Sequence, residues 1–128
     1  FSFSGLKSAV LNYLNKCKMQ GVEVDRADVA ASFQEAVVDV LSDHAVSAAL
    51  ECGMDKVAIA GGVASNQALR AKMKEKCQKN NLKFYYPSPI FCTDNAAMIG
   101  AAGYYEYKKG VRDGLDLNAV PNLKIGQR

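Results

Sequence analysis

Residues 56–66, KVAIAGGVASN, indicate the fold class more clearly than any other part of the sequence. After Lys56 the residues are apolar at successive positions and do not alternate, which is typical of a strand covered on both faces in a parallel sheet. Two glycines, Gly61 and Gly62, follow this strand, and a helix is expected to open near Ser65 and to run to about Asn80. The stretch therefore predicts a strand, a tight turn and a helix in succession.

The same turn is a candidate binding site. Ligands of open α/β sheets bind beyond the carboxyl ends of the strands, and the free N–H groups of a helix start suit a phosphate or carboxylate. Glycine also lets a ligand approach the backbone closely. The alternative is an ordinary strand-to-helix turn in which Ser65 caps the helix. The turn is not a Walker loop, because no Gly-Lys-Ser/Thr sequence follows the glycines.

On either side of this stretch, the apolar spacing predicts several helices and one further strand. A second strand is expected over residues 82–86, where prolines end it, and a strand–helix–strand order implies a parallel pair with a right-handed crossover. Two strands are too few for a free-standing sheet, so a partner for the sheet is expected to be missing. The other expected elements are a helix capped by Ser4 and stopped by Gly21, a long helix capped by Asp28 or Asp25 and ended by Gly53, a last helix from Thr93 or Asp94 to Gly110, and an irregular tail over about 111–128.

The last expected helix is rich in small residues, which predicts close packing on a neighbour. It also carries the second candidate site residue, Asp94, within Cys92-Thr93-Asp94-Asn95. Asp94 is interpreted either as a helix cap, with Thr93 as a rival, or as a carboxylate that binds a metal. The single histidine, His44, excludes any metal site that needs two histidines.

Composition and charge indicate a globular protein and leave nucleic-acid binding open. The net charge of +3 is too small to indicate nucleic-acid binding, and 49% hydrophobic residues suit a globular chain. The four cysteines form no Cys-x-x-Cys pair, which predicts free thiols in a cytoplasmic protein. No apolar run approaches the roughly 18 residues of a membrane span. The chain opens without a methionine, so it is expected to be an excised or processed piece.

Three segments together resemble one family. They are FSFSGLK at residues 1–7, GGVASNQALR at residues 61–70 and CTDNAAMI at residues 92–99, and AASFQ at residues 30–34 also fits. Their order and spacing are similar to those of the tRNA N6-adenosine threonylcarbamoyltransferases, formerly labelled O-sialoglycoprotein endopeptidase or glycoprotease. The resemblance covers nearly the whole chain.

The resemblance implies an actin-like, sugar-kinase-like and Hsp70-like ATPase fold with two lobes, of which residues 1–128 would form a single C-terminal lobe fragment. The family moves a threonylcarbamoyl group from threonylcarbamoyl-adenylate to N6 of adenosine 37 in tRNA, with one iron or zinc ion and accessory partner proteins. By this resemblance Asn66, with the backbone of Gly61 and Gly62, contacts the adenylate or an ATP-type nucleotide, and Asp94 ligates the metal.

The resemblance also implies what the chain lacks. The family's remaining metal ligands are a His-x-x-x-His pair that has no counterpart here, so this chain alone is expected to be inactive and to bind metal weakly. The alternatives are a sugar kinase or ATPase lobe of the same fold, a metallopeptidase as in the older label, and a non-enzymatic binding module. A lobe without its partner is also expected to expose apolar surface and to self-associate.

Overall fold

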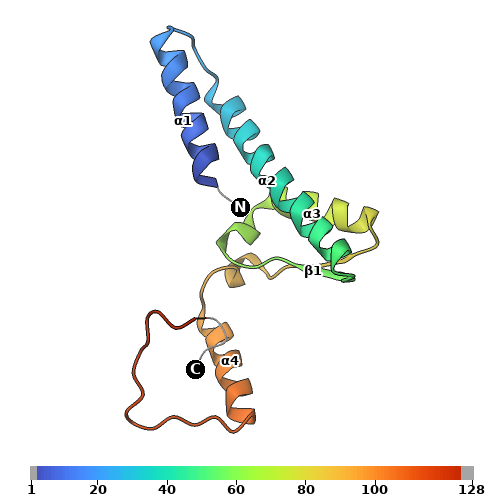
Figure 1. The fold of residues 1–128 in the computed structure, drawn as a ribbon, viewed down its shortest axis with the longest axis vertical. Coiled ribbons are helices and arrows are strands. Elements are labelled where there is room, and N and C mark those ends of the chain that lie inside the picture. The colour runs from blue at the N-terminus through green and yellow to red at the C-terminus, as the bar shows by residue number, and fades with distance from the viewer. Residues whose placement is uncertain (1–2, 125–128) are drawn as a thin grey trace. The chain divides into compact units, whose positions relative to one another are not determined.

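The computed structural model describes residues 3–124, and the chain divides into two compact units, Phe1–Thr93 and Asp94–Arg128 (Figure 1). The first unit carries three helices and two strands in the order α1, α2, β1, α3, β2, with short 3₁₀ helices after each strand. The second carries one helix, α4. The predicted α/β class with a short parallel sheet and several helices is confirmed, while the single-lobe assignment stays a prediction.

Two long helices open the first unit. Helix α1 spans Phe3–Met19, so Ser4 lies inside the helix, where its carbonyl accepts a bond from the Ser8 hydroxyl, and its predicted capping role is wrong. Residues 1 and 2 of the FSFSGLK segment lie outside the described residues. Gly21 follows the helix with a φ of 66°, as its predicted stop requires.

Helix α2 spans Arg26–Glu51 and is capped by Asp25, whose Oδ1 accepts from the Ala27 N–H at 2.7 Å. Of the two predicted caps, Asp28 is therefore wrong, and it lies in the first turn of the helix, where a carboxylate suits the positive end of the helix dipole. The helix ends at Glu51, and Gly53 follows it with a φ of 64°, as its predicted stop requires.

The sheet is a parallel pair. Strand β1 spans Lys56–Ala58 and strand β2 spans Lys83–Tyr85, with Val57 opposite Phe84. They are joined through the 3₁₀ helix η1 at Gly62–Ser65 and helix α3 at Gln67–Lys79. Val57 is buried but the residues on either side of it are exposed, so the predicted coverage of both faces is wrong for the described chain. Helix α2 contacts β1 and helix α3 contacts β2, while the first and last residues of both strands are exposed.

The core of the first unit lies where α2 and α3 meet the strands. Met73 and Cys77 of α3 are 1% and 0% exposed, and they pack with Val38 of α2 and Val57 of β1. The hydroxyl of Ser42, also 0% exposed, donates to the Asp39 carbonyl at 3.1 Å, which satisfies its hydrogen-bonding need. All four cysteines are free thiols, as predicted, and burial raises the pKa of the Cys77 thiol.

An ion-pair ladder borders this core. Lys72 Nζ lies 2.6 Å from Glu35 and 2.8 Å from Asp39, and Lys76 Nζ lies 2.6 Å from Asp43 and 3.8 Å from Asp39. The carboxylates of α2 and the lysines of α3 both repeat every four residues, so the charged residues of each helix lie on one face of that helix. The hydrogen bond from Lys72 holds the pKa of Asp39 below its usual value.

The second unit consists of α4, Ala96–Lys108, and the irregular tail up to residue 124. Asn95 caps the helix, since its Oδ1 accepts from the Met98 N–H at 3.0 Å, so the predicted start at Thr93 or Asp94 is wrong by one or two residues. The predicted end at Gly110 is confirmed by its φ of 85°. None of the residues of α4 is buried against the described chain, so what its small residues pack on stays a prediction.

No helix among residues 3–124 is long and apolar enough to cross a membrane.

Candidate functional site

The di-glycine turn lies at the carboxyl end of β1, as predicted. Gly61 has a φ of 84°, a left-handed conformation that glycine adopts without the steric cost that a side chain brings. Its carbonyl accepts from the Ala64 N–H at 3.0 Å, which closes the first turn of η1. Gly62 has ordinary φ, and a Cβ built on it would lie 3.8 Å from the Thr93 methyl group, which is van der Waals contact. The two glycines therefore differ: the positive φ of Gly61 requires glycine, whereas a side chain at Gly62 would meet only ordinary contact.

Asn66 caps helix α3. Its Oδ1 accepts from the Leu69 N–H at 2.9 Å, and its Nδ2 donates to Gln34 Oε1 at 3.0 Å. The alternative interpretation, in which Ser65 is the cap, is wrong, because the Ser65 hydroxyl donates to the Gly62 carbonyl inside the turn. The side chain of Asn66 is thus held at the N-terminus of α3 by one hydrogen bond to α3 and one to α2.

Two adjoining hollows lie beside this turn, between α2 and the segment from β1 to α3. The larger has a volume of about 580 Å³ and the smaller, which Gln34 and Asn66 border, about 200 Å³. They share Leu41, Val63 and Leu69, and most other lining side chains are also apolar. His44 borders the larger hollow. Apolar walls with a few polar groups at one end are typical of small-molecule sites.

Arg70 is the site residue that sequence reasoning missed. Its guanidinium donates to the Ala64 carbonyl in η1 and to the Pro87 carbonyl after β2, the latter at 2.9 Å. It also stacks on Tyr86, with 4.6 Å between the guanidinium carbon and the ring centroid. No local pattern indicates its contacts with the turn before α3 and with the segment after β2. The only available signal was its place in the segment GGVASNQALR, four residues after Asn66.

Asp94 is exposed and begins the second unit. Because Asn95 caps α4, the interpretation of Asp94 as a cap is wrong, and its carboxylate has no role in starting the helix. Among residues 3–124 no three His, Cys, Asp or Glu side chains gather into a possible metal site. One carboxylate does not make a transition-metal site, which needs three or four protein ligands. Asn66 and Asp94 belong to different units, so the crevice that they are expected to share stays a prediction.

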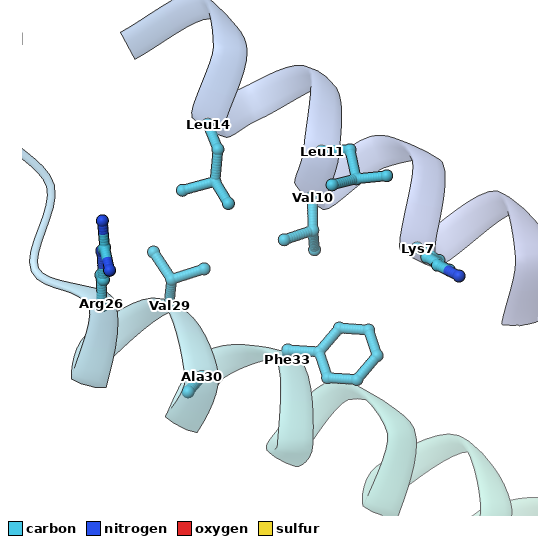
Figure 2. A pocket seen from close by; sticks show the side chains of 8 residues that line it. All are labelled: Lys7, Val10, Leu11, Leu14, Arg26, Val29, Ala30 and Phe33. Carbon is cyan, nitrogen blue, oxygen red and sulfur yellow. The ribbon is translucent and has the colours of Figure 1, made fainter. Parts of the chain in front are cut away.

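A third hollow, of about 390 Å³, lies between α1 and α2 (Figure 2). Val10 and Leu14 of α1 point toward Val29 and Phe33 of α2, and Lys7 and Arg26 stand at its margins. It has no cluster of polar groups converging on its centre, so it resembles a packing surface rather than a catalytic site.

The strand, the glycine turn and the capped helix beside an apolar hollow place the chain in the class of α/β proteins. The family model for TsaD, tRNA N6-adenosine threonylcarbamoyltransferase, matches residues 1–101. The chain therefore belongs to the tRNA N6-adenosine threonylcarbamoyltransferase family, and the predicted resemblance is confirmed.

Proteins with this name from three clostridia are similar to the chain along all of its 128 residues. The identity is 59% for the protein of Clostridium botulinum strain Hall, 59% for that of Clostridium novyi strain NT and 57% for that of Clostridium perfringens strain SM101. The chain spans 38% of the length of each of these curated relatives.

Proposed function

We propose that this chain is part of an acyltransferase that moves a threonylcarbamoyl group from threonylcarbamoyl-adenylate to N6 of adenosine 37 in tRNA. The observation that supports this most is the Gly61–Asn66 turn beside an apolar hollow, in a chain that belongs to this family. The family match favours the transferase over the sugar-kinase and metallopeptidase alternatives. The chain spans 38% of its relatives' length, so on its own it is proposed to be inactive.

The reaction is a substitution at the carbamoyl carbon. The N6 amine of the adenosine forms a new N–C bond, the bond from carbon to the phosphate oxygen breaks, adenosine monophosphate leaves, and the amine loses one proton. In this proposal the backbone N–H groups at Gly61 and Gly62 and the side chain of Asn66 hold the adenylate. The apolar walls beside them exclude water from the activated acyl group, which would otherwise be hydrolysed.

Asp94 is proposed as one ligand of the enzyme's iron or zinc ion. A carboxylate oxygen is a suitable ligand for either metal, and Asp94 is not used as a helix cap. The described residues do not complete such a site, so no step of the reaction is assigned to the metal here. The tRNA, the accessory proteins and a cytoplasmic location are proposed on the same family basis. Self-association of the isolated chain is proposed because a lobe without its partner exposes apolar surface.

The transfer assay tests this proposal in the full-length protein that contains this chain. Purified enzyme with its accessory proteins is mixed with threonylcarbamoyl-adenylate and tRNA, and modified adenosine is measured by mass spectrometry. Asp94→Ala should lower the bound metal and the modified product together, whereas Asp113→Ala, an exposed aspartate of the same unit, should change neither. Equal metal content and equal product in both variants would remove Asp94 from the site, and no product with the unaltered enzyme would refute the transferase.

A further inference from the structure

Arg70 joins the turn that precedes α3 to the segment that follows β2. It lies half-buried in the first turns of α3. Its Nε donates to the Ala64 carbonyl, six residues earlier, and its Nη2 donates at 2.9 Å to the Pro87 carbonyl, 17 residues later. The first carbonyl belongs to the turn between the two glycines and Asn66, and the second to the chain leaving β2. One planar group therefore fixes two loops to each other.

The surroundings of the guanidinium hold its orientation. Its face lies on the ring of Tyr86, and Nη2 is 3.2 Å from Cys92 Sγ. The Cys92 side chain is 4% exposed, and its thiol lies 3.6 Å from the Ser88 carbonyl. Stacking on one face and hydrogen bonds along the edge leave the guanidinium one orientation, which a lysine ammonium cannot reproduce because it has neither the plane nor the fork of donors.

We propose that Arg70 is a positioning residue for the adenylate: it holds the Gly61–Asn66 turn in its ligand-binding shape by clamping the Ala64 carbonyl to the segment 86–92. This inference rests on the proposed function, because it assumes that the turn binds the adenylate. Ala64 lies two residues before Asn66, so movement of its carbonyl moves the backbone that carries the Asn66 side chain. A contact that holds the adenylate equally in the bound state and in the transition state raises KM and leaves kcat unchanged when it is lost.

If Arg70 had only a structural role, its replacement would change the stability of the fold and not the binding of the adenylate. Helix α3 carries a second residue that can serve as a control for this. Lys72 is two residues from Arg70 and fastens α3 to α2 through Glu35 and Asp39, and neither ion pair includes a residue of the Gly61–Asn66 turn. Lys72→Ala should lower the melting temperature without changing adenylate binding. Arg70→Ala removes the clamp and also loosens the fold, so Arg70→Lys, which keeps the charge and the helix propensity, is the decisive variant.

The test uses the full-length enzyme with its accessory proteins, at a temperature at which every variant is folded. Transfer rates are measured against the concentration of threonylcarbamoyl-adenylate for Arg70→Lys, Lys72→Ala and Asn66→Ser. We expect Arg70→Lys to raise KM for the adenylate about tenfold with kcat changed less than about twofold, as for lost positioning of a bound ligand. Lys72→Ala should leave KM unchanged.

The outcomes separate this inference from the proposed function. If Asn66→Ser raises KM and Arg70→Lys does not, the turn binds the adenylate but Arg70 does not position it, and the inference fails alone. If neither variant changes KM, the turn is not the adenylate site and both fail. An equal rise of KM in Arg70→Lys and Lys72→Ala would show a general loss of stability and would also overturn the inference.

Discussion

Asn66 has two possible duties, and they can be separated by substitution. In the structure its Oδ1 caps α3 and its Nδ2 bonds to Gln34. Replacing an asparagine cap by alanine costs about 1 kcal/mol, and an exposed side-chain hydrogen bond adds about 0.5 kcal/mol. Asn66→Ala should therefore lower the free energy of unfolding by about 1.5 kcal/mol. This exceeds the small effect on folding that a purely ligand-binding residue would have.

Asn66→Ser is the matched variant. Serine caps a helix nearly as well as asparagine but cannot reach Gln34, so this variant should lose only about 0.5 kcal/mol. Gln34→Ala should lose about the same, and the double variant no more than either single one, because both changes remove one shared bond. In the full-length enzyme Asn66→Ser should still weaken adenylate binding, since the amide that is proposed to contact the ligand is gone.

The assay is urea unfolding of this chain followed by circular dichroism at 222 nm, with the free energy of unfolding taken by linear extrapolation. Equal stabilities of Asn66→Ala and Asn66→Ser would show that the cap contributes nothing, and the assignment of the helix start would be wrong. Additive losses in the Gln34→Ala, Asn66→Ser double variant would show that the bond between α2 and the turn is absent in solution.

Three other predictions follow from the fold. Met73→Ala should cost about 2–5 kcal/mol because the side chain is fully buried, while Met54→Ala, at an exposed site, should change the urea midpoint little; equal midpoints would place Met73 outside the core. Gly61→Ala should destabilise the chain by about 1–2 kcal/mol, because φ is positive there, and an unchanged midpoint would contradict the left-handed turn. Lys72 lowers the pKa of Asp39 in the folded state. The pair therefore stabilises the fold fully at a pH above the ordinary carboxyl pKa of 3.8, and this stability should be lost as the pH falls through the lowered pKa of the folded state. Asp39→Asn should flatten the acid limb of a plot of urea midpoint against pH, and an unaltered limb would exclude the pair.

The sequence was sufficient for the order of the elements, and less so for their ends. The ends at Gly21, Gly53 and Gly110 were predictable because a positive φ selects glycine. The helix starts were not, because two or three capping residues stand close together at each start. Asp25 rather than Asp28, and Asn95 rather than Asp94, are chosen by where the preceding chain turns, which local sequence does not specify.

In the candidate site, too, some features could be predicted from the sequence and others could not. The glycine turn could be located because its residues are consecutive. The contact between Asn66 and Gln34 spans 32 positions and depends on how α2 lies along α3, so no local pattern indicates it. The prediction that β1 is covered on both faces was wrong. A continuous apolar run indicates that a strand can be buried on both faces, but it does not indicate whether this chain supplies both covering layers.

The ladder of charges between α2 and α3 has a property that its individual distances hide. Carboxylates and lysines share a four-residue repeat, so sliding one helix along the other by four residues, about 6 Å, would bring Lys72 or Lys76 opposite another carboxylate of the same row. Electrostatics alone would tolerate several alignments of the pair. Only one of these alignments packs Met73 and Cys77 in the core with Val57. Apolar packing therefore determines the alignment, and this alignment places Asn66 within hydrogen-bonding distance of Gln34.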